Sequence, residues 1–263
     1  MNDLLKGYST PEKYCRRGEM MIQKMRSPRR FLAAIFLIGL IAACGKNDNT
    51  STNPDGNNNN GDTYDIDNNG IPQFVNTDYI DLAKIGRISK FRSSVGHDYS
   101  DAFESCRSMK HYFEPKSDVD WSSINISSPV SGTISRIFDE WAGTQVQIRS
   151  AEFPAFYFII FHINLVHPLN VGDTVDVGQL LGNHIGSQTM SDIAVGVNTP
   201  NGWKLISYFD VMTDSLFGSY QGRGLTARSV AIISKAERDA DPLTCDGELF
   251  QNQGNIENWV TLN

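Results

Sequence analysis

The cysteines of this sequence carry the chemistry that is easiest to assign, beginning with Cys44. It closes an apolar run at 31–43, which ends in Ile-Ala-Ala-Cys and follows four basic residues: Lys24, Arg26, Arg29 and Arg30. This order is typical of a bacterial lipoprotein export signal, in which the thiol at the end of the run is lipidated. As a helix, the run would reach about 20 Å, short of the roughly 30 Å hydrocarbon core of a bilayer. We therefore predict a signal segment at 1–44 with a lipid anchor at Cys44, in preference to a membrane-spanning helix.

Residues 1–19 precede this pattern, so the signal itself would start at Met20, Met21 or Met25. Cys44 is followed by Gly45 and not by aspartate, as in lipoproteins passed on to an outer membrane, and we expect a domain that faces the periplasm. Removing 1–44 takes away eight Lys/Arg and three Asp/Glu, which leaves a formal charge of about −12. A domain this acidic repels phosphate backbones, so nucleic acid is not an expected partner.

Two further cysteines, Cys106 and Cys245, remain after the predicted processing. An envelope location exposes them to an oxidising compartment, which favours a disulfide between them. Closing a loop of about 140 residues would stabilise the fold by roughly 5 kcal/mol in the chain-entropy model. The alternative is that the two thiols are buried separately.

The segment 45–70 is rich in Asn, Asp, Gly, Ser and Thr and has almost no apolar residues. Burial of its few apolar side chains would not offset the conformational entropy lost on ordering, so a disordered linker is predicted. Its end places oxygen side chains at alternate positions before a glycine: Asp65, Asp67 and Asn69. That spacing resembles the start of a calcium-binding loop, although the twelfth position is Asn76 where such loops carry glutamate. Calcium at these residues is a secondary expectation.

The remainder, 71–263, is long enough to bury the core of one domain. Its run at 156–163 is β-branched and aromatic almost throughout, as a buried central strand requires. Shorter strands or hairpins are predicted at 128–137, 144–148, 171–182, 192–197 and 203–211. Helical periodicity is confined to 102–113, 209–220 and 227–238. The expected class is mainly β with peripheral helices.

Four segments follow an order that resembles the lysostaphin-type (LytM-like) zinc peptidases of peptidoglycan. They are Gly-His-Asp-Tyr-Ser-Asp at 96–101, Ser-Pro-Val-Ser-Gly-Thr-Ile at 128–134, Phe-His-Ile-Asn-Leu at 161–165 and Val-Gly-Asp-Thr-Val-Asp-Val-Gly-Gln-Leu-Leu-Gly at 171–182. The resemblance covers about 96–197. It implies an antiparallel β-sheet or barrel-sandwich core, the duplicated hybrid motif, with peripheral helices around it.

The resemblance also implies a zinc site. His97 and Asp101 match two metal ligands, and His162 matches the histidine of the central strand. Asp192 stands where the family has a proton-handling histidine, and the third ligand histidine is replaced by Ala194. A methyl group cannot bind zinc, and losing one of three protein ligands normally abolishes tight binding. We therefore predict an incomplete metal site at His97 and Asp101, with His162 and Asp192 in the catalytic positions.

Other side chains could complete this site. A small shift in register would let Asp192 supply an oxygen ligand, and three histidines could reach it from loops: His111, His167 and His184. If 102–113 is helical, Glu104, Arg107, Lys110 and His111 could line a polar groove near His97; the alternative is a solvated helix face. The hairpin pattern also resembles a biotinyl or lipoyl carrier domain, in which Lys110 would be the modified lysine. Lys110 lies 19 residues before Pro129, farther than such domains usually allow.

These observations favour a lipid-anchored envelope protein with a degenerate peptidase-like domain. Its expected role is to bind peptidoglycan or to regulate an envelope hydrolase. The alternative is a zinc-dependent peptidoglycan endopeptidase with His97, Asp101 and an irregular third ligand, Asp192. A third class is an adhesion or structural lipoprotein that uses the calcium-like loop at Asp65.

Overall fold

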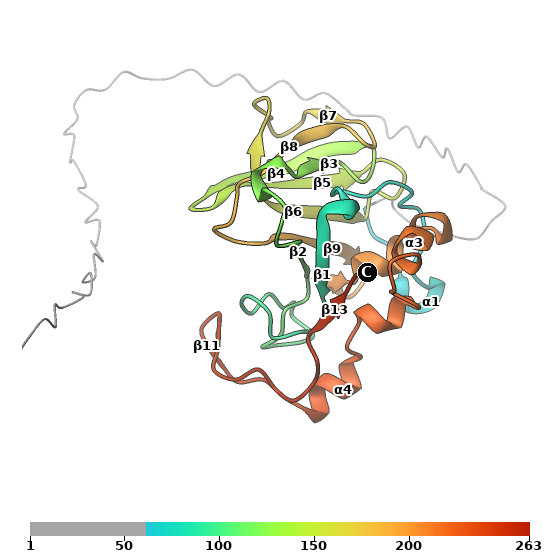
Figure 1. Ribbon diagram of the computed structural model, residues 1–263. Helices are drawn as coiled ribbons and strands as arrows, with labels where there is room; N and C mark the ends of the chain where they lie inside the picture. Colours follow the sequence, from blue (N-terminus) through green and yellow to red (C-terminus); the bar gives the residue numbers. More distant parts are fainter. Residues whose placement is uncertain (1–61) are drawn as a thin grey trace, which may run out of the picture. The chain divides into compact units, whose positions relative to one another are not determined.

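The computed structural model describes residues 62–263, coloured in Figure 1. The predicted export signal, the lipid anchor at Cys44 and most of the predicted linker lie outside the described residues. Within 62–263, none of the helices is both long enough and apolar enough to cross a bilayer.

A twisted antiparallel sheet forms the body of the fold (Figure 1). Its main path is β13 (Trp259–Thr261), β1 (Ile85–Ser89), β2 (His111–Pro115), β9 (Ser191–Thr199), β6 (Phe156–Leu165), β5 (Gly143–Ser150), β4 (Gly132–Glu140) and β7 (Thr174–Val175). Off this path, β10 (Gly202–Ile206) pairs with β9, while β8 (Leu180–His184) joins β6 to β3 (Asn125–Ser127). The predicted class, mainly β with an antiparallel sheet, is confirmed.

The two middle strands, β6 and β9, are buried along nearly their whole length. One face of β6 enters the main core, where Phe158 and Ile160 pack beside Val195. The opposite face belongs to a smaller apolar cluster, in which Ile159 and Phe161 pack with Ala194. Because both faces of β6 are covered and neither meets water, its residues need not alternate between apolar and polar, which explains the unbroken apolar run in the sequence.

The helices are shorter than the sequence pattern indicates. The segment 209–220 contains two of them, α2 (Tyr208–Val211) and α3 (Asp214–Gln221), because Thr213 caps a new helix after Met212. The segment 227–238 divides into a 3₁₀ turn (Arg228–Ala231) and α4 (Lys235–Ala240). Between them the chain pairs with Phe91, and Ser234 opens α4 with a capping box. The predicted strand at 203–211 likewise ends at Ile206, since Ser207 caps α2.

The predicted helix at 102–113 is wrong. This segment forms turns that lead into β2, and Cys106 has a φ of 54°, which an α-helix cannot accommodate. Bridges from Ser108 to Ser93 and Tyr99 hold the turns in place. A helix was expected because the spacing of apolar residues matched a helical period, but tertiary pairing overrides that local signal.

The folded domain also starts earlier than predicted. The short helix α1 (Ile66–Asn69) lies within the supposed linker, and Tyr64 packs edge-on against Phe153 and Phe156. Tyr64 also donates its backbone N–H to Asn198. Two aromatic contacts and a strand-edge hydrogen bond therefore order a polar segment whose composition alone predicts disorder.

The calcium-like loop uses its oxygens within the protein. The Asp65 carboxylate accepts the backbone N–H groups of Asp67 and Asn68 and caps α1. Asp67 pairs with Lys204 at 2.6 Å. Both carboxylates therefore make contacts within the protein.

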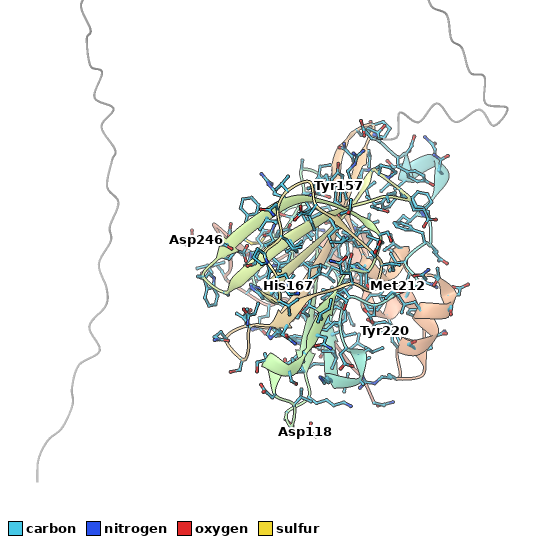
Figure 2. All side chains as sticks on the ribbon, turned by 90° about the horizontal axis from the view of Figure 1, so that it is seen from above. Asp118, Tyr157, His167, Met212, Tyr220 and Asp246 are labelled. Carbon is cyan, nitrogen blue, oxygen red and sulfur yellow. A yellow bond between two sulfur atoms is a disulfide. The ribbon has the colours of Figure 1, made fainter. Side chains whose placement is uncertain are left out.

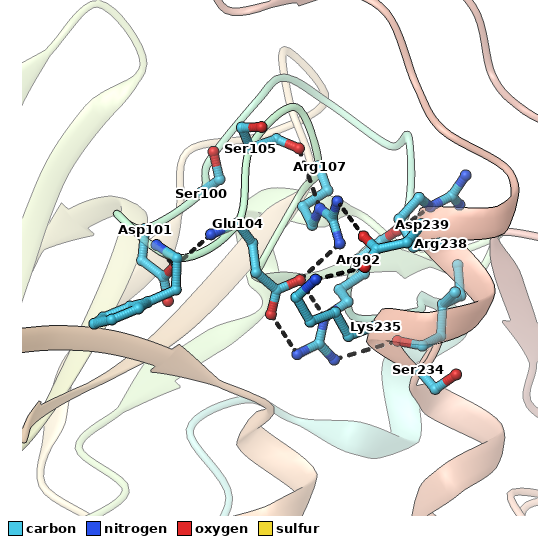
Figure 3. A network of polar contacts seen from close by, with 12 residues as sticks. Arg92, Ser100, Asp101, Glu104, Ser105, Arg107, Ser234, Lys235, Arg238 and Asp239 are labelled. Atoms are coloured by element: carbon cyan, nitrogen blue, oxygen red, sulfur yellow. Dashed lines mark hydrogen bonds and ion pairs between the residues drawn. The ribbon is translucent and has the colours of Figure 1, made fainter. Parts of the chain in front are cut away.

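The predicted disulfide between Cys106 and Cys245 is confirmed. It ties the turns at 92–108 to the C-terminal hairpin of β11 (Cys245–Asp246) and β12 (Leu249–Phe250), which lie side by side in Figure 1. Figure 3 shows a second tie, in which Glu104 pairs with Arg92 and Arg107 at 2.6 and 2.7 Å, and Arg107 reaches Asp239 of α4. The C-terminal region is thus pinned across the domain covalently and by charge.

Candidate functional site

A cavity of about 630 Å³ opens between the β4–β5 turn, the segment 96–99 and the C-terminal hairpin. Its lining includes two of the predicted site residues, His97 and His162. The other polar and aromatic residues in its walls are Asp98, Tyr99, Lys110, Tyr112, Glu140, Trp141, Gln145, Phe161, Thr189 and Glu248. The cavity is therefore the place to test what chemistry the sequence motifs can perform.

The Lys110 ammonium group lies at the floor of this cavity. It pairs with Asp192 at 2.5 Å, and both side chains are almost completely buried. The rings of Tyr99, Tyr112 and Phe161 surround the ammonium, with centroids 4.1–4.9 Å away. An ion pair removed from water in this way is held by the partner charge and by the ring faces.

His162 reaches the same carboxylate from a distorted point in β6. The pairing with β5 shifts between Thr144 and Val146, so β6 carries one extra residue there, and His162 has a φ of 63°. Side chains alternate along a regular strand, and this bulge lets both Phe161 and His162 line the cavity. Backbone strain of this kind in a non-glycine residue is concentrated at functional sites.

Both ring nitrogens of His162 face acceptors. Nδ1 lies 2.9 Å from the carbonyl oxygen of Ala142, and Nε2 lies 3.1 Å from Asp192 Oδ1. Acceptors beside both nitrogens favour the protonated ring, which can donate from each. Burial opposes the charge, but the hydrogen bond and the negative charge of Asp192 outweigh it and raise the pKa of His162. Likewise, burial would raise the pKa of Asp192, but Lys110 and His162 together lower it.

His97 completes the group as a neutral imidazole. Its Nδ1 donates to the carbonyl oxygen of Asp98 at 2.9 Å, and its Nε2 accepts from the Lys110 ammonium at 3.2 Å. This pattern specifies a single tautomer with no free lone pair. The atom that would bind a metal in the predicted site is thus occupied by a lysine N–H.

Asp101, predicted as the second metal ligand, is directed elsewhere. Its Oδ1 accepts the backbone N–H groups of Phe103 and Glu104, and its Oδ2 accepts that of Leu205 at 2.8 Å. The carboxylate therefore shapes the turn after 101 and ties it to β10. It does not line the cavity with His97.

Ala194 lies in β9, the strand that pairs with β2. The antiparallel pairing of β2 with β9 sets His111 opposite Ile193 and Tyr112 opposite Asp192. One more step of this register places Lys110 opposite Ala194, on the same face. Ala194 itself packs with Ile159 and Phe161 in the smaller apolar cluster, so an imidazole at this position would displace apolar neighbours.

The other three histidines do not join the group. His111 is buried between the Ser89 carbonyl oxygen and the Ser207 hydroxyl, and burial lowers its pKa to about 4. His184 is buried in β8, where desolvation lowers its pKa to about 4 as well. His167 lies on an exposed turn (Figure 2).

Sequence reasoning missed the partner of Asp192 and most of the cavity wall. Lys110 drew notice only as a groove residue or a carrier lysine, because nothing local indicates that its ammonium is buried. Glu140 and Trp141 form the turn between β4 and β5, and an exposed tryptophan in a polar turn is a signal that could have been used. Glu248 comes from the C-terminal extension, which no motif linked to His97.

The side chains at the predicted metal site are not suited to bind zinc. His97 Nε2 accepts from a lysine, both ring nitrogens of His162 face acceptors, and Asp101 binds backbone amides. Zinc needs deprotonated ligands with free lone pairs that converge on one point. Over residues 62–263, no group of three or more His, Cys, Asp or Glu side chains is arranged to hold a metal.

The fold and site together define a class: an antiparallel β domain, similar to lysostaphin-type peptidases, with a Lys–Asp–His cluster in the cavity. Solved structures that the chain matches include the lytM protein of Ruminococcus gnavus, at 14% identity and a TM-score of 0.31 over 39% of this chain and 43% of that one. The chain thus spans less than half of that protein.

Two further matches cover nearly the whole length of the solved chain. The catalytic domain of the prophage-encoded protein EnpA from Enterococcus faecalis is 17% identical, with a TM-score of 0.34 over 52% of this chain and 93% of that chain. A chain of the SpoIIQ–SpoIIIAH pore-forming complex is 13% identical, with a TM-score of 0.34 over 57% of this chain and 96% of that chain. No family model and no curated protein matches the sequence.

Proposed function

We propose that this chain is a lipid-anchored envelope protein whose peptidase-like domain works as a metal-independent binding module. One observation carries the proposal: the Lys110 ammonium lies between His97 Nε2 and Asp192 Oδ2, at 3.2 and 2.5 Å. The protein's own cation thereby takes up the lone pairs that a zinc ion would need.

The same contacts argue against hydrolysis. Metal-assisted cleavage of a peptide bond needs an open coordination position that activates water, together with a base that removes its proton. Lys110 offers no coordination position. His162 has an acceptor beside each ring nitrogen, an arrangement that favours the protonated ring over one free to accept a proton.

The location and the partner class rest on the sequence. The export signal ending at Cys44 would anchor the domain to a membrane, and Gly45 favours the outer membrane facing the periplasm. There the domain would bind peptidoglycan or a hydrolase that acts on it. The cavity beside His97 and His162 offers a concave surface for such a ligand.

The metal content of the full chain, purified without chelators, tests the proposal. Elemental analysis should find much less than one zinc per chain, both in the wild type and in a His97→Ala variant. Sedimentation with purified peptidoglycan, with and without a chelator, should give equal binding if the protein uses the wall as its ligand.

Near-stoichiometric zinc in the wild type, lost in His97→Ala, would overturn the proposal. That result would favour the endopeptidase alternative with Asp192 as an irregular ligand, and peptidoglycan cleavage would then be assayed. Zinc present equally in both proteins would indicate binding away from this cavity.

A further inference from the structure

We propose that Lys110 and Asp192 condense to an intramolecular amide, a covalent cross-link between β9 and the residue that precedes β2. The two groups are already in contact, with Lys110 Nζ 2.5 Å from Asp192 Oδ2. A C=O bond is about 1.2 Å long, so Nζ lies no more than about 3.7 Å from Cγ, the carbon that it would attack. Reacting atoms held about 3–3.5 Å apart behave as if one partner were present at about 10⁵–10⁸ M. The fold therefore supplies the proximity that amide formation needs.

Burial favours the amide over the ion pair. The side chains of Lys110 and Asp192 are only 1% and 0% exposed. Three rings, those of Tyr99, Tyr112 and Phe161, enclose the lysine nitrogen. Two charges removed from water carry a desolvation cost of several kcal/mol each in general, whereas an amide is neutral. The same enclosure keeps away the water that would hydrolyse the product.

A surface pair of the same residue types shows that distance alone is not enough. Lys235 Nζ and Asp239 Oδ2 are also 2.5 Å apart, but their side chains are 54% and 42% exposed. Water solvates both charges there, so the ion pair is the stable form. Contact together with burial distinguishes Lys110 and Asp192 from this surface pair.

Two histidines flank the reacting atoms. His97 Nε2 accepts from the Lys110 ammonium at 3.2 Å and is placed to take the proton that must leave before Nζ can attack. Glu248 Oε2 lies 3.8 Å from His97 Nδ1 and would stabilise the positive charge that this transfer creates. On the other side, His162 Nε2 lies 3.1 Å from Asp192 Oδ1 and is placed to protonate it. A nucleophile, a base and an acid thus converge on one carboxyl group.

The reaction forms the bond from Lys110 Nζ to Asp192 Cγ and breaks the bond from Cγ to Oδ1. Nζ passes one proton to His97 and loses a second when the tetrahedral intermediate collapses, which leaves an amide N–H. Oδ1 receives one proton from His162 and the second from Nζ, and it departs as water. Both histidines line the cavity, so proton exchange with solvent returns them to their starting states. No other reactant is consumed.

The cross-link is compatible with the proposed binding module. The amide N–H of Lys110 would still face His97 Nε2, so that lone pair stays occupied. The bond would close a loop from 110 to 192, which limits the conformations of the unfolded chain as a disulfide does. It would therefore fix β9 beside β2 permanently.

Peptide mapping of the full chain by mass spectrometry tests the cross-link. After reduction of the disulfide and digestion with trypsin, Lys110 and Asp192 should be recovered in one branched peptide. Its mass should be lower by one water molecule than the sum of its two parts. Trypsin cleaves after a lysine only when its amine is free, so unlinked protein gives separate peptides. Lys235 and Asp239 are the internal control and should be recovered unlinked.

Two variants locate the chemistry. Lys110→Arg keeps the positive charge without the reactive amine, so it should show no loss of water. His162→Gln keeps a hydrogen-bond donor beside Asp192 but cannot deliver a proton, and it should form the bond at least about a hundredfold more slowly. In a denaturing gel, reduced wild type should migrate faster than Lys110→Arg, because the closed loop makes the unfolded chain more compact.

Separate, unmodified peptides for Lys110 and Asp192 from folded wild type, after prolonged incubation, would overturn the proposal and leave an ion pair. So would the same loss of water in Lys110→Arg. A His162→Gln variant that melts like the wild type and links as fast would overturn the role of His162 as the acid. Zinc content of the same preparations separates the two proposals. Zinc-free protein without the amide refutes only the cross-link, whereas stoichiometric zinc refutes the binding module.

Discussion

The Lys110 ammonium lies 2.5 Å from the Asp192 carboxylate, and both side chains are almost wholly buried in the sheet. The pair joins β9 to the residue that precedes β2, two segments about 80 positions apart in sequence. Because Asp192 also receives His162, one carboxylate holds two cations. The charge balance of the cavity therefore depends on Lys110.

We expect Lys110→Met to lower the free energy of unfolding by about 3–5 kcal/mol, because it leaves Asp192 buried with only His162 as a partner. The double variant with Asp192→Asn should lose less than the sum of the two single changes. Urea denaturation of the three variants gives the coupling energy. Lys84→Met removes a partly exposed pair with Asp81 and should cost about 1 kcal/mol or less. A Lys110→Met variant as stable as the wild type would contradict this picture.

A second prediction concerns zinc. Introducing Asp192→His and Ala194→His supplies two imidazoles near His97, but the Lys110 ammonium still lies 3.2 Å from His97 Nε2. We expect this variant to stay metal-free and a variant with Lys110→Ser in addition to take up zinc. Elemental analysis after dialysis against zinc distinguishes them. Equal zinc uptake by both would show that Lys110 is no obstacle.

The strands of this site could be predicted more readily than its contacts. The apolar run at 156–163 identified β6, because a strand buried on both faces has consecutive apolar residues. The bulge that turns His162 into the cavity has no such signal, since it depends on pairing with β5. The spacing of His97 and Asp101 likewise says nothing about where Asp101 points, and its carboxylate is directed by backbone amides of distant Leu205.

The C-terminal region shows the same limit. A compartment argument was enough to predict the pairing of Cys106 with Cys245, since only two cysteines remain after the predicted processing. The place of the hairpin over the cavity could not be predicted, because Glu248 meets His97 only through folding. β13 also pairs with β1, so a strand near the C-terminus lies beside one near the start of the domain. This pairing could not be predicted, because neither strand has a distinctive pattern in the sequence.

Removing the disulfide should loosen this hairpin more than the sheet. Cys106→Ser with Cys245→Ser opens a loop with a sequence separation of 139, for which we expect a loss of about 2–5 kcal/mol. Hydrogen exchange should rise first at 241–258, since the β-sheet does not depend on the bond. Arg107 still contacts Asp239, so α4 should remain protected. Uniform loss of protection across β6 and β9 would contradict a local role.

A buried carboxylate on the helical side predicts a dependence of stability on pH. Asp78 accepts hydrogen bonds from the Tyr79 N–H and from the hydroxyls of Tyr208 in α2 and Tyr220 in α3, the latter labelled in Figure 2. Burial nevertheless dominates and raises the pKa of Asp78 from 3.8 to about 6. The folded state then holds a proton that the unfolded chain releases at lower pH.

The contribution of Asp78 to stability should therefore be greatest below about pH 4 and should fall as pH rises to about 6, with no further change above that. Relative to Asp78→Asn, which keeps an uncharged partner for the tyrosines, the wild type should lose about 1–3 kcal/mol over this interval. Urea denaturation of both proteins between pH 4 and 7 measures the difference. Asp118→Asn, on an exposed turn (Figure 2), serves as the control and should leave the profile unchanged. A constant difference between wild type and Asp78→Asn would mean that the carboxylate titrates normally in the folded protein.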